Sequence, residues 1–493
     1  MMENNIQMTS EEKIKKYFKN MIVLKSPRRT KLFSAMNIPT FMRDWIVMRF
    51  SDSDGNIDEE QVSEYVKKTI PEKSQWNNYL ADMFHDGCSV KMLTKVRIDF
   101  DMKTKNALFS LPVFGVPVHK GEAVAEWSVI EKYREYLLSP TEVWGIVRLM
   151  CDESNDGKGY VLKLIDFAPF CPYRIDLKYF IRMRQYFTTE EWINLIISAI
   201  DYSPDGYADE EEKLSVLKRL LPFVEKRLNL IELAPKETGK SYMFSQLSQY
   251  GWLVSGGSMS RAKLFYDISR KTNGLVSKYD YVAFDEIQSI RFTDPLEMGG
   301  ALKGYLESGS YHVGDYRGTG DAGVMLMGNI PSESMDVNTN MLKDLPEVFH
   351  DPALLDRFHG FIEGWKIPKM RENLKASGWA LNSEYFSEVL HLLRGESVYR
   401  SVVDKLLMIP KDAATRDTEA VKRICTAFMK LLFPNVTDVG DINIDEFEKY
   451  CLSPALAMRS IIKKQLGVLD PGEFGGKTIP DIRADRSVIS ERK

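Results

Sequence analysis

The chain has 493 residues, which is enough for two or three domains around a large buried core. Hydrophobic residues make up 44% and charged residues 28%, and the formal net charge is only −4, so any nucleic-acid surface must be a local patch. No apolar run approaches the ~20 residues that span a bilayer, and the first residues lack a signal-peptide core, so we expect a cytoplasmic protein without a membrane partner. Five scattered cysteines without a CxxC pair and six dispersed histidines argue against disulfides and against a protein-built zinc site.

Residues 1–85 are predicted to form a helical, basic N-terminal region in which residues 1–12 are disordered. The segment 13–31 holds eight Lys or Arg, no acidic residue and two interleaved aromatic residues. Such a run is either the solvated face of a helix or a local surface for nucleic acid. In the second interpretation the DNA contacts come from Lys15, Lys16, Lys19, Arg28 and Arg29.

Residues 86–205 are predicted to form a small β-rich domain with connecting helices. Short runs rich in Val, Ile and Phe extend from Val90 to Ile165, and turn residues such as 152–158 separate the last two as in a hairpin. This pattern fits a barrel or collar that faces nucleic acid, and it fits a purely structural interaction module equally well. Helical segments follow, with Thr188 as the expected N-cap of one of them.

Residues 206–370 contain the most informative stretch, which begins with NLIELAPKETGKS (residues 229–241). A strand that runs through a tight loop into a helix directs backbone N–H groups at one point, which suits a polyphosphate such as ATP. Lys240 would place its charge on the β- and γ-phosphates, and the Ser241 hydroxyl would ligate Mg²⁺. The predicted nucleotide contacts are Pro235, Lys236, Glu237, Thr238, Gly239, Lys240, Ser241, Tyr242 and Asp285.

Two further apolar strands end in polar residues at suitable distances along the chain. YDYVAFDEI ends in Asp285, which would hold the metal together with Ser241, and in Glu286, which would orient or deprotonate the attacking water. GVMLMGNI ends in Asn329, which would hold that water from the other side. Together the three strands predict an α/β P-loop NTPase core with a parallel sheet.

The predicted phosphate loop departs from the motif G-x-x-x-x-G-K-[ST] at one position. Ala234 stands where the motif has its first glycine, so the turn must tolerate a β-carbon. Glu237 also places an anion in a loop that holds anions, with Lys236 beside it to offset the charge. Slow hydrolysis and weak ATP binding therefore both remain open.

The rest of the core is predicted to hold a strand at 252–255, a helix at 259–270, a helix at 296–307 and a hairpin at 309–323. The hairpin is either an ordinary surface feature or, in a ring, a pore element with Tyr311, Tyr316 and Arg317 protruding, in which case Arg317 contacts DNA. Arg357 is either a surface ion-pair residue or an arginine finger that reaches a neighbour's γ-phosphate. Residues 371–474 are predicted to form a helical lid on the nucleotide, with helices at 383–393, 417–432 and 444–466, and residues 475–493 a tail.

The sequence resembles the Lon-related BrxL proteins of bacterial BREX phage-defence systems from about Phe187 to Phe474. Co-linear blocks such as FTTEEWINLIISAI, GLVSKYDYVAFDEI and LLDRFHGFIEGWKIPKMR carry the resemblance, whereas the first 180 residues match less clearly. The resemblance implies an AAA+ domain, related in general plan to Lon and to MCM helicases, that forms homo-oligomeric rings, hexameric or stacked, around DNA with weak sequence preference. It further implies Lys240 and Ser241 as Walker A, Asp285 and Glu286 as Walker B, Asn329 as sensor 1 and Arg357 as the finger. EAVKR resembles the second-sensor helix of Lon, which makes Lys422, or else Arg423, a nucleotide contact.

Two features limit what the resemblance transfers. The phosphate loop lacks the glycines that the family usually has at 234 and 237, and longer members continue into a Lon-type peptidase domain for which this sequence has no room after the lid. We therefore expect an ATPase without protease activity, with other phage-defence proteins as further partners. Two alternatives remain: a protein-remodelling ATPase that feeds a separate protease, and a nucleotide-gated DNA-binding scaffold with little turnover.

Overall fold

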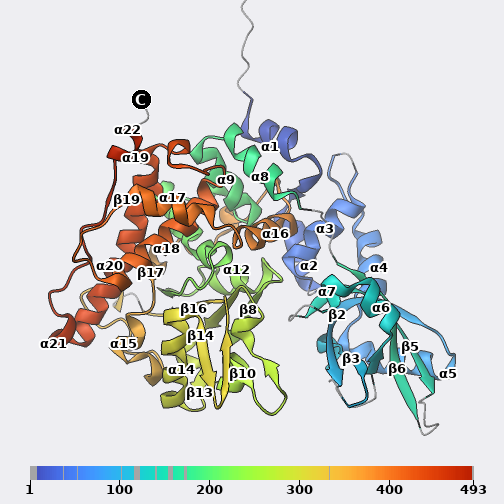
Figure 1. Ribbon diagram of the computed structural model, residues 1–493. Helices are drawn as coiled ribbons and strands as arrows, with labels where there is room; N and C mark the ends of the chain where they lie inside the picture. Colours follow the sequence, from blue (N-terminus) through green and yellow to red (C-terminus); the bar gives the residue numbers. More distant parts are fainter. Residues whose placement is uncertain are drawn as a thin grey trace, which may run out of the picture. The chain divides into compact units, whose positions relative to one another are not determined.

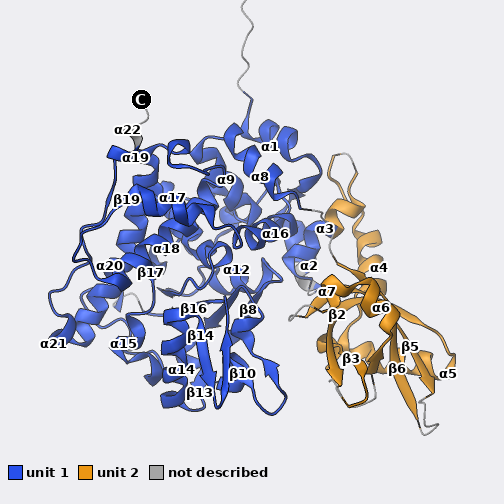
Figure 2. Ribbon diagram, viewed as in Figure 1, with its two compact units in different colours: residues 1–45, 175–493 blue, residues 46–174 orange. Residues whose placement is uncertain are grey.

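The computed structural model of the chain (Figure 1) describes residues 8–36, 38–52, 54–101, 103–115, 123–138, 142–153, 159–170, 175–331 and 334–490. It divides into two compact units, residues 1–45 with 175–493 and residues 46–174 (Figure 2). This division differs from the predicted domains, because residues 46–85 group with the β-rich domain and residues 175–205 group with the ATPase core. The boundary after residue 45 lies inside a single helix, α3 (Thr40–Phe50).

A parallel sheet of five strands forms the centre of the first unit, in the order β17-β7-β16-β12-β8. Every residue of β7 and β12 is buried, as expected for parallel strands with both faces covered. The predicted α/β core with a parallel sheet is confirmed, and the carboxyl ends of β7, β12 and β16 lie at one edge. The strands are β7 (Leu230–Ala234), β8 (Gly251–Ser255), β12 (Tyr281–Asp285), β16 (Gly323–Asn329) and β17 (Gly360–Glu363).

The helices around this sheet begin and end on clear local signals. The side chain of Asp294 accepts a hydrogen bond from the backbone N–H of Glu297 and so caps α14 (Pro295–Ser308), which ends at Gly309 with φ 77°. Thr188 caps α9 (Thr189–Ala199) in a capping box with Glu191, as predicted. The other helices of this part are α8 (Leu177–Met183), α10 (Glu210–Leu217), α11 (Leu221–Val224), α12 (Lys240–Gln246) and α15 (Pro352–Leu355).

The predicted helix at 259–270 is wrong. Instead, β9 (Ser258–Met259), which pairs parallel with β13 (Arg291–Phe292), precedes α13 (Arg261–Leu264). A hairpin of β10 (Tyr266–Asp267) and β11 (Thr272–Asn273) follows α13. The helix stops because Phe265 is drawn into the core and Lys271 takes a positive φ of 53°. The hairpin predicted at 309–323 is present and consists of β14 (Ser310–Val313) and β15 (Tyr316–Thr319).

The N-terminal segment of the first unit is ordered from residue 8 onward within the described chain. Thr9 and Glu12 form a capping box that starts α1 (Ser10–Phe18), so the prediction of disorder is wrong for residues 8–12, and residues 1–7 lie outside the described residues. Next, β1 (Ile22–Lys25) pairs antiparallel with β18 (Gly378–Leu381), and α2 (Pro27–Ala35) follows.

The C-terminal part is mostly helical. The predicted helix at 383–393 is α16 (Ser383–Leu393), whereas the predicted helix at 444–466 is interrupted by a wider turn over Glu448–Leu452. Residues 483–484 of the predicted tail form β20 (Arg483–Ala484), which pairs with β19 (Leu407–Met408). No described helix has both the length and the apolar character to cross a membrane. The remaining helices are α17 (Val398–Leu406), α18 (Thr415–Leu432), α19 (Ile444–Phe447), α20 (Ser453–Leu469), α21 (Pro471–Phe474) and α22 (Ser487–Ser490).

The second unit contains a closed barrel in the strand order β2-β3-β4-β6-β5, so the predicted small β domain is a barrel. Its interior is apolar and includes Val96, Phe109, Val147 and Phe167. The predicted hairpin pairing of β5 with β6 is present, although residues 154–158 of its turn lie outside the described residues. The elements are β2 (Val90–Asp101), β3 (Asn106–Ser110), β4 (Ala123–Ala125), β5 (Val143–Glu153), β6 (Tyr160–Pro169), α4 (Glu59–Thr69), α5 (Trp76–His85), α6 (Trp127–Lys132) and α7 (Arg134–Leu137).

Candidate nucleotide-binding site

The turn between β7 and α12 is the loop that the sequence predicts to hold phosphates. Glu237 and Gly239 take positive φ angles of 70° and 79°, whereas Ala234 keeps its extended strand position and pairs with Asn329. The methyl group of Ala234 has room because residue 364 is glycine: a β-carbon built on Gly364 would lie 2.2 Å from it. The loop therefore tolerates the alanine as predicted, and Glu237 is the residue that adopts the left-handed backbone.

A cavity of about 280 Å³ opens at this turn, at the carboxyl edge of the sheet. The carbonyl of Pro235, which does not line the cavity, accepts a hydrogen bond from Lys240 Nζ at 3.2 Å. The structure thus gathers the residues predicted for phosphate, metal and water around one space. The cavity is lined by Lys236, Glu237, Thr238, Gly239, Lys240, Ser241, Tyr242, Asp285, Glu286 and Asn329.

Lys240 is the buried cation of this cavity. Its Nζ lies 3.0 Å from Oδ1 of Asn329, so the side chains predicted for Walker A and sensor 1 touch directly. Burial lowers the pKa of Lys240. A bound polyphosphate would favour the charged ammonium and thus strengthen its own binding.

Ser241 and Asp285 supply the oxygen atoms that a cation would need. Ser241 Oγ donates to Asp285 Oδ2 at 2.5 Å, and the backbone N–H of Glu286 donates to Asp285 Oδ1 at 3.0 Å. One hydroxyl and one buried carboxylate fit Mg²⁺ in a P-loop, because nucleotide and water oxygens complete its shell. Glu286 is exposed at the cavity, where its carboxylate can reach a water molecule.

A fully buried ion pair, Arg219 with Glu232, holds the phosphate loop in place. Arg219, in the short turn Lys218–Leu220, binds both carboxylate oxygens of Glu232 on β7, at 3.0 and 2.6 Å. The same guanidinium donates to the carbonyl of Thr238 at 2.7 Å and to its hydroxyl at 3.0 Å. Burial alone would lower the pKa of Arg219, but the Glu232 carboxylate outweighs it and raises that pKa. The position of Thr238, two residues before Lys240, therefore depends on this pair.

A second buried network ties α12 to the N-terminal segment. Tyr242 Oη donates to Asp201 Oδ2 at 2.5 Å and lies 2.7 Å from Thr40 Oγ1. The other oxygen of Asp201 accepts from Lys25 Nζ and from Arg43 Nη2, each at 2.7 Å. These two cations lower the pKa of Asp201 despite its burial, which would raise it. Lys25 belongs to the basic run at residues 13–31, but it is buried and serves a structural role in this network.

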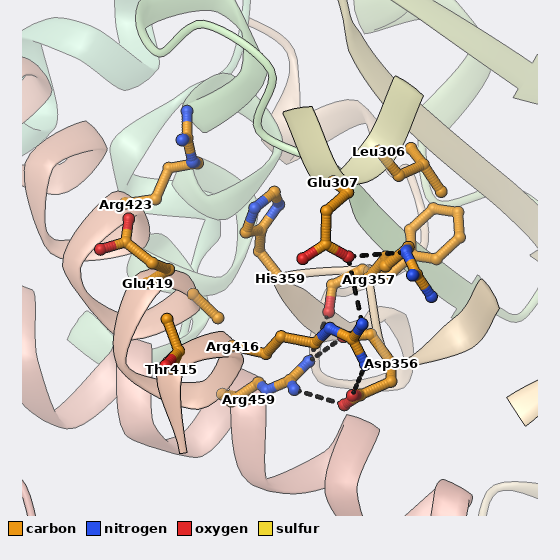
Figure 3. Close-up of a pocket in the computed structure, with 12 residues that line it drawn as sticks. Leu306, Glu307, Asp356, Arg357, His359, Thr415, Arg416, Glu419, Arg423 and Arg459 are labelled. Atoms are coloured by element: carbon orange, nitrogen blue, oxygen red, sulfur yellow. Dashed lines mark hydrogen bonds and ion pairs between the residues drawn. The ribbon is translucent and has the colours of Figure 1, made fainter. Parts of the chain in front are cut away.

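Arg357 lies in a different cavity, of about 350 Å³ (Figure 3). Its Nε is 2.7 Å from Glu307 Oε2, and Arg416 Nη2 is 3.2 Å from the same oxygen. Arg416 also contacts Asp356 at 3.0 Å, and Arg459 contacts Asp356 at 2.6 Å. Arg357, Arg416 and Arg459 therefore converge on two carboxylates, Glu307 and Asp356, and none of the three lines the phosphate cavity.

Comparison with known proteins shows the family of the chain. A family model described as "Lon-like protease BrxL-like, ATPase domain" matches residues 162–479, and one described as "BREX system Lon protease-like protein BrxL N-terminal" matches residues 16–150. The chain belongs to the BrxL family. The resemblance stated from the sequence is confirmed, and the ATPase-domain match gives the sheet a Lon-like AAA+ fold.

Two curated relatives of the BrxL family are similar over long stretches. "Lon-like protease BrxL" of Escherichia coli O9:H4 (strain HS) is 27% identical over 466 residues, which cover 94% of this chain and 65% of the relative. "Lon-like protease BrxL" of Bacillus cereus (strain H3081.97) is 32% identical over 337 residues, which cover 67% of this chain and 48% of the relative. The chain thus spans less than two thirds of the length of either relative.

The structure does not bring the predicted second-sensor residue Lys422 to the phosphate cavity. Its Nζ pairs with Asp404 Oδ1 at 2.8 Å, and the alternative, Arg423, lines the Arg357 cavity and donates to the carbonyl of Lys226. The reason is the position of α18, which packs on α11, α17 and α20. In the described chain, residues 371–474 contribute no side chain to the lining of the phosphate cavity, so they do not cover it as the predicted lid would.

The residues proposed for DNA are spread over several elements. Lys15 and Lys16 are exposed on α1, where Lys15 pairs with Glu11 at 2.6 Å, and Lys19 is exposed just after α1. Arg28 and Arg29 lie on α2, where Arg29 donates to the carbonyl of Leu24 at 2.9 Å. The cations of the 13–31 run therefore lie on two helices and on the segment between them.

The hairpin β14–β15 differs in part from its prediction. Tyr311 does not protrude but is buried in the core, and Tyr316 is half-buried. The cause is the alternation of side chains along a strand, which turns Tyr311 inward. Arg317 is exposed, as predicted.

Sequence reasoning missed Arg219, Glu232, Asp201 and Arg43. Glu232 left a visible signal, since it is a single carboxylate in the otherwise apolar strand NLIELA. Arg43 and Asp201 left none, because they are separated by 158 residues and meet only through the tertiary fold.

We predict that the Arg219–Glu232 pair shapes the phosphate loop more than it stabilises the fold. Glu232→Leu leaves a buried guanidinium unpaired and should cost about 3–5 kcal/mol, whereas Arg219→Met with Glu232→Leu should recover most of that loss. The double variant should nevertheless bind nucleotide more weakly than the wild type, because Thr238 loses both hydrogen bonds. Thermal melting and titration with a fluorescent ATP analogue measure the two effects, and wild-type nucleotide affinity in the double variant would contradict the prediction.

Proposed function

We propose that this BrxL-family chain binds and hydrolyses ATP with Mg²⁺, assembles into a ring, and binds DNA in bacterial phage defence. The observation that carries the proposal is the convergence of Lys240, Ser241, Asp285, Glu286 and Asn329 around one cavity. Hydrolysis of a γ-phosphate needs a cation to balance charge, a metal ligand pair and a group that orients water. These residues supply all three.

Each side chain has a role that its position supports. Lys240 would neutralise the β- and γ-phosphates, and Ser241 and Asp285 would hold Mg²⁺, whose chemistry is to neutralise charge that develops on the phosphate oxygens. Glu286, exposed at the cavity, would orient or deprotonate the attacking water. Asn329, 3.0 Å from Lys240 Nζ, would exchange that contact for one to the γ-phosphate or the water.

The position of Arg357 supports a ring. Arg357 precedes β17 by three residues and so lies near the amino end of the sheet, where the backbone of His359 contacts Asn229. The phosphate loop begins at the other end of the neighbouring strand β7, whose five residues span about 17 Å. This separation supports a role of Arg357 at a neighbour's nucleotide rather than at its own, with Arg416 and Arg423 in the same cavity.

DNA binding is the part of the proposal that rests on local charge. The whole chain is slightly acidic, so contacts must come from exposed cations such as Arg317, Lys16 and Arg28. Contacts of this kind reach phosphates and carry little sequence information, so we expect weak sequence preference. We further propose that the chain acts beside other phage-defence proteins in the bacterial cytoplasm, and the BREX description of the family model supports the defence part of this role.

Two substitutions test the chemistry. Lys240→Ala should weaken ATP binding, because it removes the cavity's buried cation. Glu286→Gln should keep ATP bound but lose hydrolysis, because the amide cannot accept a proton from water. Equilibrium binding of labelled ATP and phosphate release, measured with and without duplex DNA, separate the two effects. Unimpaired turnover in both variants would remove the ATPase proposal, and DNA binding without any wild-type turnover would favour the scaffold alternative.

Mixing two inactive variants tests the ring. Arg357→Ala lacks the finger and Glu286→Gln lacks the water-orienting group, so a mixed ring regains some interfaces that hold both groups. A finger of this kind is typically worth ~10³ to 10⁵ in rate. We expect phosphate release to rise clearly above that of either variant alone, with unmixed variants of equal total concentration as controls. A monomeric mass together with no recovery on mixing would defeat the ring.

A further inference from the structure

Glu307, in the last turn of α14, supplies a carboxylate that two arginines of the Arg357 cavity share. A single oxygen, Oε2, lies 2.7 Å from Arg357 Nε and 3.2 Å from Arg416 Nη2, and both contacts are drawn in Figure 3. The arginine that we assign to a neighbour's γ-phosphate is thus already bound by an anion of its own chain.

The charges of Glu307 and Arg416 lie at helix ends that disfavour them. Glu307 is next to the last residue of α14, where the free carbonyl groups carry partial negative charge. Arg416 is in the first turn of α18, where the free N–H groups carry partial positive charge. Neither residue stabilises its own helix, so the helices do not account for these two residue types.

The end of α14 is fixed without the Glu307 contact. Arg227 Nη1 donates to the carbonyl of Ser308 at 2.5 Å and so satisfies one of the free carbonyl groups at the helix end. Lys303, one turn earlier on α14, forms an ion pair with Asp351, which is the N-cap of α15. Loss of the Glu307 contact would therefore leave α14 in place against α15.

The segment that carries Arg357 is fixed by a different arginine. Arg459 is fully buried, and its Nη1 donates to the carbonyls of Asp356 and Phe358, at 3.0 and 2.7 Å, on either side of Arg357. Its Nη2 also pairs with Asp356 Oδ1 at 2.6 Å. Glu307 therefore acts on the guanidinium of Arg357, while Arg459 holds the backbone.

The contact of Glu307 with Arg357 is close but poorly directed. Arg357 Nε is buried, yet within the described chain its N–H makes no aligned hydrogen bond, so the 2.7 Å contact is an ion pair alone. Arg357 Nη1 donates to the carbonyl of Ala353, which folds the side chain back onto α15. The Glu307 side chain is 47% exposed, and an ion pair that is open to water contributes little net stability. A stronger anion could therefore displace this carboxylate at small cost.

A γ-phosphate is an anion of the kind that would replace the carboxylate. It has three oxygen atoms and a higher charge, and a guanidinium binds phosphate through two parallel hydrogen bonds. Carboxylate and phosphate oxygens are acceptors for the same N–H groups, so they compete for Arg357. ADP has no γ-phosphate and would leave the Glu307 contact intact.

We propose that Glu307 is a positioning residue that keeps Arg357 and Arg416 bound to its carboxylate until a neighbour's γ-phosphate displaces it. The finger then engages only at interfaces that hold a triphosphate. This inference rests on the proposed ATPase activity and ring, and it adds the regulation of the finger to them.

Steady-state hydrolysis by the assembled full chain gives the first test. Glu307→Gln keeps the size of the side chain but removes its charge, and should lower KM for ATP by about two- to five-fold, which is the worth of a partly exposed ion pair. The kcat should change by less than about two-fold, because a competitor opposes the ground state and the transition state equally. Glu297→Gln is the matched control, since it removes the same charge from a half-exposed ion pair on the same helix and should leave both constants unchanged.

Equilibrium binding of labelled nucleotides gives the second test. Glu307→Gln should raise the affinity for a non-hydrolysable ATP analogue by the same about two- to five-fold and should leave the affinity for ADP unchanged. A purely structural role of Glu307 would not separate the two nucleotides in this way. In the Arg357→Ala background, Glu307→Gln should lose most of its effect on the analogue, because it acts through the finger.

The outcomes separate the inference from the proposed function. A fall in kcat at unchanged KM would show that Glu307 orients the finger for catalysis, which overturns the inference while the finger stands. Unchanged constants in Glu307→Gln, an equal gain in ADP affinity, or a full effect in the Arg357→Ala background would each overturn it as well. A wild-type chain that neither binds nor hydrolyses ATP defeats the inference together with the proposed function. Melting temperature and oligomeric mass confirm that each variant is folded and assembled.

Discussion

The nucleotide site depends on one buried ion pair, Arg219 with Glu232. A charge pair removed from water gains little net stability, because desolvation offsets most of its Coulomb attraction. Here the guanidinium also makes two hydrogen bonds to Thr238, so the pair connects the centre of β7 to the middle of the phosphate loop. The pair thereby fixes the position of the loop, although neither of its two residues lines the cavity. The pair therefore gives a structural role to Glu232, the charged residue of a strand that is otherwise apolar and fully buried.

The unusual phosphate loop is accommodated by neighbours distant in sequence. Ala234 fits because Gly364 on the adjacent segment leaves space for its methyl group. Glu237 adopts a left-handed backbone, and its carbonyl accepts a hydrogen bond from the N–H of Met370 at 2.8 Å. The segment after β17 therefore supports the loop at two points. The missing glycines are compensated in the fold, so the departures from the motif do not by themselves argue for a defective site.

The sequence predicts those parts of the site that depend only on where apolar strands end along the chain. Asp285, Glu286 and Asn329 follow apolar strands, and parallel strands bring their carboxyl ends to one edge, so their meeting with Lys240 follows from spacing alone. Lys422 and the hairpin β10–β11 could not be predicted in this way. The side of the sheet on which α18 packs is decided by tertiary contacts, and Tyr266 leaves the predicted helix to stack on a residue 50 positions away. Local propensity carries no information on either.

The two ends of the central sheet carry different candidate functional residues. The carboxyl ends of β7, β12 and β16 carry the phosphate cavity, whereas the amino end of β17 carries Arg357. In the proposed ring, one chain would therefore contribute to two sites, its phosphate cavity to one and Arg357 to the other. Strands β12 and β16 are buried and short, so they transmit displacement as rigid segments rather than by bending. A shift of Asn329 toward a γ-phosphate would therefore move β16, and with it the hairpin that carries Arg317. Exchange of the Lys240–Asn329 contact for a phosphate contact is therefore the smallest event that would couple ATP binding to a movement of β16.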